Sequence, residues 1–191
     1  MKKVPILTLV DMLREIPDEE FHCDPVYRFL DQNPVDSDSL EPYSFWSEKF
    51  YTRNLVYKDE RFELMVICWE EGQSSRIHNH ADQMCWMTVP FGKLRGQNFK
   101  VQDIVESQGY CKLEKTDSFS LAECLAAKVE LEAPIHQILN LPEYSSRAAS
   151  VHIYSKPFDK CLSYCNETDR FSEVNLQYTS VGGRLREDVV L

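Results

Sequence analysis

A long series of short, strand-like segments begins at Tyr51 and constrains the fold more than any other feature. Turn residues separate the segments, with Gly92, Gly96 and Gly109 among them. Many short strands at roughly regular spacing predict a β-sandwich or a β-barrel. The expected strands are Tyr51–Tyr57, Phe62–Trp69, Cys85–Val89, Lys93–Phe99, Ile104–Gly109, Ala127–Leu131, Ile135–Leu139, Ala148–Tyr154 and Val174–Tyr178.

The part of the chain before this series has helical patterning. Thr8 can cap a first helix, and Asp24-Pro25 is typical of the start of a second one. We therefore expect a mainly β protein with short N-terminal helices, built as one domain. Residues 1–42 would form the helical lead-in and connection, residues 43–178 the barrel, and residues 179–191 a C-terminal tail.

Composition and charge exclude several classes of function. The 191 residues suit one well-buried domain, and the net charge of −10 argues against binding to nucleic acid. The seven cysteines include no C-x-x-C pair, as expected for a reduced protein of the cytoplasm. No apolar stretch approaches the roughly 18 residues of a membrane span. We expect a cytoplasmic monomer that binds neither nucleic acid nor membrane.

A histidine pair lies in the middle of the strand series. In an extended strand, residues two apart project from the same face, so His78 and His80 can offer two imidazoles to one metal ion while Asn79 points away. The alternative is that these histidines are hydrogen-bonded residues of the barrel. A cysteine, Cys85, follows five positions after His80 and could add a thiolate ligand.

A second alternating pattern lies in the segment Ala148–Tyr154. Ser150, His152 and Tyr154 share one face of the expected strand and could form a hydroxyl–imidazole–phenol chain. They could equally be three core residues that satisfy one another's hydrogen bonds.

Together, two motifs resemble those of the cupin family. The first has Gly72, His78, His80, Cys85 and Gly92 at the cupin spacing, and the second has His136 followed by Asn140. The resemblance implies a single jelly-roll-like barrel and a metal held by His78, His80 and His136. Cupins usually have a Glu ligand where this chain has Cys85, so the resemblance implies a three-histidine site, suited to iron(II). Zinc bound by the three histidines and Cys85 is the competing interpretation.

A narrower resemblance, spread over residues 51–161, is to the cysteine dioxygenase family. The matching segments are Tyr51–Val56, Cys68-Trp69, Ile77–His80 with Cys85, Ser150–Tyr154 and Ser155–Cys161. The resemblance implies that Arg53 clamps the substrate carboxylate beside Tyr51, and that Trp69 packs by the site. It implies that Tyr154 hydrogen-bonds near substrate and oxygen, that His152 and Ser150 orient it, and that a thioether joins Cys85 to Tyr154, as in animal members.

The implied activity is the oxidation of the thiol of L-cysteine by O2 to cysteine sulfinate, a step of cysteine catabolism and taurine biosynthesis. Iron(II) would be the cofactor, with cysteine bound through its thiolate and amine. Two alternatives remain open. One is a related thiol dioxygenase that acts on 3-mercaptopropionate or cysteamine, and the other is a non-catalytic metal-binding cupin.

Overall fold

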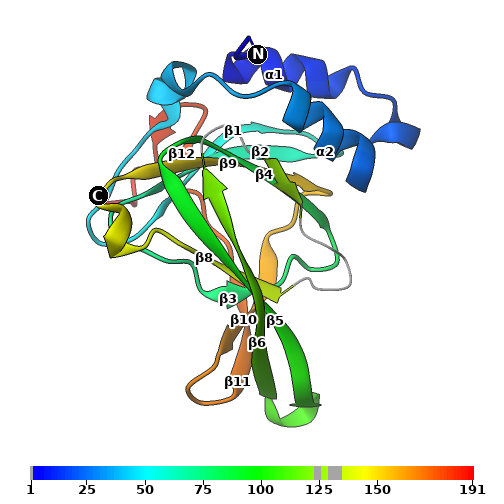
Figure 1. Ribbon diagram of the computed structural model, residues 1–191, viewed down its shortest axis with the longest axis vertical. Coiled ribbons are helices and arrows are strands. Elements are labelled where there is room, and N and C mark those ends of the chain that lie inside the picture. The colour runs from blue at the N-terminus through cyan, green and yellow to red at the C-terminus, as the bar shows by residue number, and fades with distance from the viewer. Residues whose placement is uncertain (1, 123–125, 129–134) are drawn as a thin grey trace.

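Two β-sheets and two N-terminal helices make up the structure, a computed structural model that describes residues 2–122, 126–128 and 135–191. The sheets face each other, and the helices cover the outer face of one of them (Figure 1). The expected mainly β barrel with short N-terminal helices is therefore confirmed. None of the helices in the described ranges is long and apolar enough to cross a membrane.

Each sheet has a simple order of strands. The first sheet runs β13-β12-β1-β2-β9-β4-β7, and the second closes into a ring in the order β10-β11-β6-β5-β8-β3. The strands of the first sheet are β1 (Thr52–Lys58), β2 (Glu63–Trp69), β4 (Met84–Phe91), β7 (Ala126–Lys128), β9 (Ala148–Ser155), β12 (Ser180–Val181) and β13 (Arg184–Leu185). Those of the second are β3 (Ile77–His78), β5 (Lys93–Val105), β6 (Tyr110–Ala122), β8 (Ile135–Leu139), β10 (Lys160–Cys165) and β11 (Arg170–Asn175).

The helices pack on the first sheet through one apolar face. They are α1 (Ile6–Arg14) and α2 (Cys23–Gln32), with short 3-10 turns at Asp18–Glu20, Ser37–Tyr43, Glu106–Gln108 and Pro142–Tyr144. The first helix begins two residues before Thr8, after Pro5, so the expected Thr8 cap is wrong. Asp24 likewise lies inside the first turn of α2, where a carboxylate still complements the helix dipole.

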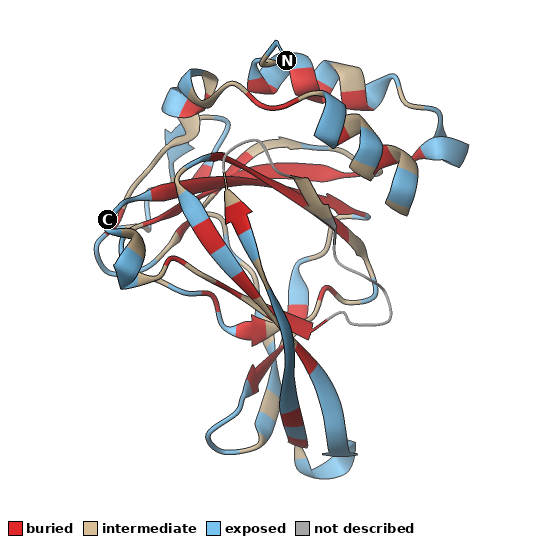
Figure 2. Ribbon diagram, in the orientation of Figure 1, coloured by how far each residue is buried: buried red, intermediate tan, exposed pale blue. Residues whose placement is uncertain are grey.

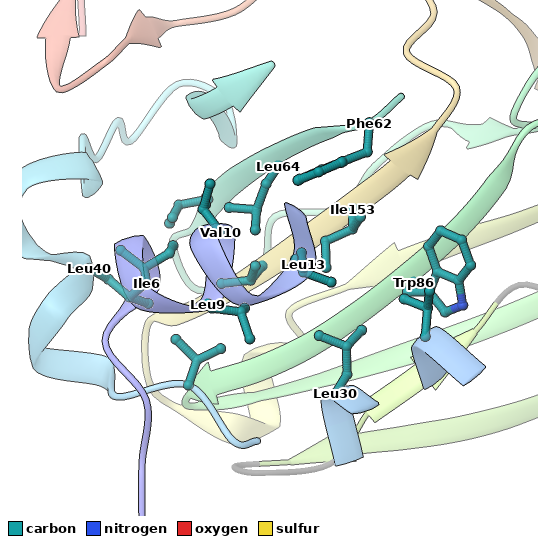
Figure 3. Packing of buried hydrophobic residues seen from close by; sticks show 14 of the residues in the cluster. Ile6, Leu9, Val10, Leu13, Leu30, Leu40, Phe62, Leu64, Trp86 and Ile153 are labelled. Atoms are coloured by element: carbon teal, nitrogen blue, oxygen red, sulfur yellow. The ribbon is translucent and has the colours of Figure 1, made fainter. Parts of the chain in front are cut away.

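Strands β2 and β9 separate two apolar clusters, because both of their faces are buried. Leu64 of β2 and Ile153 of β9 point to the helices, where they meet Leu9 and Leu13 of α1 (Figure 3). Residues one position away, such as Met65 and Tyr154, point between the two sheets. We call this second surface the inner face. Burial of each large apolar side chain contributes about 1.5–3 kcal/mol, so the helix-facing cluster stabilises the packing of the helices on the first sheet. The inner face, by contrast, also carries buried polar side chains such as Ser150 and His152.

A long hairpin formed by β5 and β6 extends beyond the sheets, and the outer half of its β5 strand is exposed (Figure 2). The expected separate strand Ile104–Gly109 is wrong: β5 runs on to Val105, and a 3-10 turn leads into β6. In this outer part, residues 100–105 of β5 are all exposed and lack the apolar alternation that marks a half-buried strand, whereas Cys111 and Leu113 of β6 are buried. The expected strand Ala127–Leu131 lies partly outside the described residues, and its described part belongs to β7, Ala126–Lys128.

The C-terminal residues differ from the tail that was expected over residues 179–191. Ser180–Val181 pairs in parallel with β1, and Arg184–Leu185 folds back on it through Gly182 and Gly183, both of which have positive φ. This hairpin extends the edge of the first sheet. The expected last strand Val174–Tyr178 is also wrong in its bounds, since β11 ends at Asn175.

The motif residues Gly72, Gly92 and Asn140 have structural explanations. Gly92 adopts a φ of +79°, and a Cβ there would lie 2.4 Å from the carbonyl oxygen of Arg147. The amide of Gly72 donates to the carbonyl of Asn140 (2.9 Å), and the Asn140 side chain donates to the carbonyl of Ser146 (2.8 Å). These bonds join the ends of β2 and β8 to the start of β9, next to the histidine strands.

Candidate metal centre and substrate pocket

Three histidines converge between the two sheets. His78 is the last residue of β3, His80 follows it, and His136 lies opposite His78 on β8. One ligand nitrogen from each lies within 4.8 Å of those of the other two. Spacing of this order lets three imidazoles bind a single ion, so the structure brings together the residues that the two motifs suggested.

The chain between the two motif histidines is held by a neighbouring strand. Asn79 donates its backbone N–H to the carbonyl of Leu162 (3.1 Å), and its side-chain Oδ1 accepts from the N–H of Leu162 (2.9 Å). Directly after His80, Ala81 and Asp82 both have positive φ, at 50° and 60°. The regular strand thus ends at His78, and His80 is placed by this anchored turn.

The histidine nitrogens are available as metal ligands at neutral pH. Burial lowers the pKa of His78 to about 4, despite the hydrogen bond to the Arg76 carbonyl, and lowers the pKa of His136 well below its usual range. Nδ1 of His78 lies 2.8 Å from the Arg76 carbonyl, so Nδ1 carries the proton and Nε2 keeps a lone pair for the metal. Protons therefore compete weakly with a metal ion for this group.

The chemistry of the donor set fits a bound divalent metal. Within the described part of the chain, no cysteine or carboxylate joins the group of His78, His80 and His136. Cys85, considered above as a fourth zinc ligand, lies instead beside Tyr154, its partner across β4 and β9. Burial raises the pKa of the Cys85 thiol far above its usual range, which disfavours the thiolate that zinc would require.

A hydrogen-bonded chain runs along the inner face of β9. The Trp69 indole donates to Ser150 Oγ (2.9 Å), Ser150 Oγ lies 2.9 Å from His152 Nε2, and His152 Nδ1 lies 3.2 Å from Tyr154 Oη. All four residues are buried. The sequence suggested the Ser150, His152 and Tyr154 chain, but the alternation along β9 could not show that Trp69, on the neighbouring β2, begins it.

The phenol of Tyr154 lies between the chain and the metal group. Its ring stacks on that of His80, with 5.8 Å between centroids. Burial raises the pKa of Tyr154 well above its usual range, so the hydroxyl keeps its proton at neutral pH. This arrangement offers a neutral hydrogen-bond donor near the three histidines.

Arg53 and Tyr51 reach the same region from β1 and the residue before it. They line a pocket of about 440 Å³ together with His78. Nε of Arg53 is buried and has no hydrogen-bond partner among the described residues. The Tyr51 ring stacks on Trp69 at 4.7 Å, which holds it beside the site. A buried guanidinium donor without a partner is costly, so this pocket is suited to an anionic ligand.

Several residues that line this pocket were not predicted from the sequence. These residues are Arg76, Cys161, Ser163, Val174, Asn175 and Gln177. Arg76 precedes the first motif histidine by two residues, which is a local signal for proximity. The others come from β10, β11 and the residues after it, and only the pairing of β10 with β3 brings them near His78.

The pKa of His152 predicts how stability depends on pH. Burial, with a further contribution from the charge of Arg53, lowers its pKa from 6.5 to about 3. Between these values the unfolded chain binds a proton that the folded protein does not, so stability falls as the pH falls below about 6.5. This histidine alone contributes a slope of at most about 1.4 kcal/mol per pH unit.

We predict that His152→Asn makes the pH dependence shallower. Urea unfolding of the metal-free protein at several pH values between about 4 and 7 measures this. The free energy of unfolding of the variant should fall less steeply on acidification than that of the wild type. Identical slopes would contradict a neutral, buried His152.

Comparison with known proteins agrees with this geometry. The chain is 29% identical over 181 residues to cysteine dioxygenase type 1 of Rattus norvegicus, covering 92% of this chain and 88% of that protein. The Homo sapiens protein of the same name is 28% identical with the same coverage, and that of Danio rerio is 27% identical over 187 residues, again covering 92% and 88%. The family model described as cysteine dioxygenase type I matches residues 2–167, and the chain therefore belongs to this family.

Proposed function

We propose that this protein is a non-haem iron(II) cysteine dioxygenase, with His78, His80 and His136 as the metal ligands. The thiol of L-cysteine would take up both atoms of one O2 molecule, so that R–SH and O2 give the sulfinic acid R–SO2H without another reductant. The observation that carries the proposal is the position of Arg53: this arginine lines the same pocket as His78, and its buried Nε has no hydrogen-bond partner among the described residues. Membership of the cysteine dioxygenase type I family supports it.

Iron(II) suits a site of three neutral imidazoles. Such ligands leave the full charge of a divalent ion unbalanced, which favours an anionic substrate that binds the metal directly. When bound, iron(II) supplies the redox chemistry by which thiol and dioxygen react. The protein's own contribution is to bind the substrate, to orient it and to place a proton donor beside it.

Arg53 and Tyr51 would hold the carboxylate end of the substrate. A guanidinium fork pairs with a carboxylate through two parallel hydrogen bonds, which fixes direction as well as charge. Trp69 would contribute indirectly, since its ring supports Tyr51 and its N–H begins the chain to Tyr154.

The chain on β9 would orient the Tyr154 hydroxyl. Ser150 accepts from the Trp69 indole, which can only donate, and Ser150 can pass its own proton to Nε2 of His152. A neutral His152 then donates from Nδ1 to Tyr154 Oη. This direction leaves the phenol proton free to point at the bound thiol and oxygen, which is the role we assign to Tyr154.

A carboxylate clamp favours L-cysteine over cysteamine, which has no carboxylate, whereas 3-mercaptopropionate shares the carboxylate and remains the alternative substrate. We expect a monomer that acts in the cytoplasm. None of the six described cysteines forms a disulfide, which supports a reducing compartment.

Oxygen uptake tests the proposed function. Purified protein loaded with iron(II) should consume O2 and form sulfinate when it is given L-cysteine in air. His136→Asn should abolish both, whereas His22→Asn, which removes the exposed N-cap histidine of α2, should not. Absence of sulfinate from the wild-type protein would contradict the proposal and favour a non-catalytic metal-binding cupin.

The clamp predicts a change in substrate selectivity. Because losing one partner of a buried ion pair costs about 2–5 kcal/mol, Arg53→Ala should lower kcat/KM for L-cysteine by about 30-fold or more. The same variant should lower kcat/KM for cysteamine by less than about threefold, since cysteamine has no carboxylate to lose. Arg95→Ala, an exposed arginine of β5, provides the matched control and should change neither value. Equal losses for the two thiols would contradict the clamp.

We further propose a thioether between Cys85 and Tyr154. The two residues are direct partners across β4 and β9, and both are buried on the inner face. Forming the bond joins Sγ to a ring carbon and removes one hydrogen from each residue, with O2 as the oxidant.

Intact-mass measurement tests this cross-link. Part of the wild-type population isolated after turnover should lack two hydrogen atoms, and Cys85→Ser should show no such loss. Cys68→Ser, a buried cysteine on the helix-facing side of β2, should behave as the wild type. A wild-type mass without the loss of two hydrogen atoms would contradict the proposed cross-link and leave the dioxygenase proposal unaffected.

A further inference from the structure

A fully buried carboxylate lies close to the site and has no part in the chemistry above. Glu63, the first residue of β2, has 0% of its surface exposed. It is the register partner of Tyr154 on β9, just as Cys85 is on the other side of that strand. Burying a carboxylate is costly unless it is paired, so its partners indicate what it does.

The partners of Glu63 come from two other segments. The hydroxyl of Tyr178 donates to Oε2 of Glu63, and Nζ of Lys58 lies 3.6 Å from the same oxygen. Oε1 has no hydrogen-bond partner among the described residues. Tyr178 therefore provides the one direct hydrogen bond that the described residues give this carboxylate.

Both donors keep their protons at neutral pH. Burial and the hydrogen bond to Glu63 raise the pKa of Tyr178 to about 12. Burial lowers the pKa of Lys58, but its hydrogen bond to Tyr178 and the charge of Glu63 outweigh this and raise the pKa to about 12. The cluster of Lys58, Glu63 and Tyr178 is thus a stable arrangement of two donors around one carboxylate.

Tyr178 directly follows the wall of the substrate pocket. The wall is the segment Val174–Gln177, all four residues of which line the pocket with Arg53 and His78. Strand β11 ends at Asn175, so the second half of the wall has no strand pairing. Its backbone is held by the N–H of Leu176 on the carbonyl of Asp159 (2.8 Å) and by the N–H of Thr179 on the carbonyl of Arg53 (2.7 Å).

Lys58 connects these attachments. Its Nζ lies 3.2 Å from Tyr178 Oη and 3.3 Å from Oδ1 of Asp159, the residue whose carbonyl holds Leu176. Both ends of the unpaired half of the wall therefore lead to one cluster, whose centre is the Glu63 carboxylate.

We propose that Glu63, Tyr178 and Lys58 form a buried latch that positions the Val174–Gln177 wall against the substrate pocket. This inference deepens the proposed function, on which it rests for the identity of the substrate. Glu63 and Tyr178 are positioning residues: they act through the wall and touch neither substrate nor metal. The bound substrate would be confined between this wall and the guanidinium of Arg53, so the latch sets substrate affinity more than the rate of the bound complex.

Tyr178→Phe tests the latch, because it removes one hydroxyl and keeps the ring that packs on the inner face. With the iron-loaded full-length protein, KM for L-cysteine should rise about fivefold or more, since the wall loses its direct hydrogen bond to a buried carboxylate, while kcat changes less than about twofold. Glu63→Leu should raise KM similarly, and combining the two substitutions should add nothing, because both remove the same bond.

Tyr57→Phe is the matched control. Tyr57 lies on β1, one residue before Lys58, and its hydroxyl also donates to a carboxylate, that of Asp59 (2.7 Å), but it packs on the helix-facing side. We expect no change in KM. An unchanged KM in Tyr178→Phe, an equal rise in Tyr57→Phe, or additive rises in the double variant would overturn the latch.

Hydrogen exchange gives a readout that does not depend on turnover. In Tyr178→Phe, backbone amides of residues 174–179 should exchange about fivefold faster or more than in the wild type, and those of the helices should not change. If the wild type fails to oxidise cysteine, the proposed function fails while this measurement still decides the latch. Unchanged exchange at residues 174–179 would overturn it.

Discussion

The register of β9 between β2 and β4 is the constraint on which the site depends. It places Glu63, Tyr154 and Cys85 side by side across three strands, and it leaves Ser150 and His152 on the same inner face. Successive residues of a strand point to opposite faces, so a slip of one position would turn the whole relay toward the helices. The apolar residues between them, such as Val151 and Ile153, prevent that slip because they are buried against α1 and α2. The helices therefore contribute to the site by fixing a strand whose other face carries it.

The described residues provide no negatively charged ligand at the metal site, and this sets the charge that a bound substrate must have. The three imidazoles supply no negative charge, burial lowers the pKa of His78 and His136, and Arg53 adds a positive charge nearby. The anion that balances this charge must then come from the ligand, which is how a substrate thiolate and carboxylate would be recognised together. The one buried carboxylate among the described residues, Glu63, pairs with Tyr178 and Lys58 rather than with the histidines. Its negative charge instead holds Tyr178, and through Tyr178 the Val174–Gln177 wall, in the proposed latch.

The sequence predicted best those strands that are largely buried in the folded protein. Ile135–Leu139 forms β8 with the expected bounds, and β1, β2 and β9 lie within one residue of theirs, because buried residues mark them clearly. The hairpin of β5 and β6 was divided wrongly because residues 100–105 of β5 are all exposed and show no apolar alternation. The cap of α1 was misplaced because packing of Ile6 against the sheet, rather than a capping side chain, starts that helix.

Site residues were likewise predicted where they belong to one local pattern and missed where they depend on contacts between distant segments. The three histidines and the β9 chain are visible as local patterns, since each pattern lies within one strand or one motif. The indole bond from Trp69, the wall at Val174–Gln177 and the Glu63 cluster depend on contacts between segments far apart in the sequence, and no local pattern signals them. Pairing of β10 with β3 and of β12 with β1 brings these segments to the metal site.

Isotope labelling of the product tests the central claim most directly. Iron-loaded protein given L-cysteine under ¹⁸O2 should form cysteine sulfinate in which both oxygen atoms carry the label, because the three-histidine site would deliver both atoms of one O2 to the sulfur. Mass spectrometry of the product distinguishes the outcomes. Sulfinate with a single labelled oxygen, or disulfide as the main product, would contradict a dioxygenase at this site.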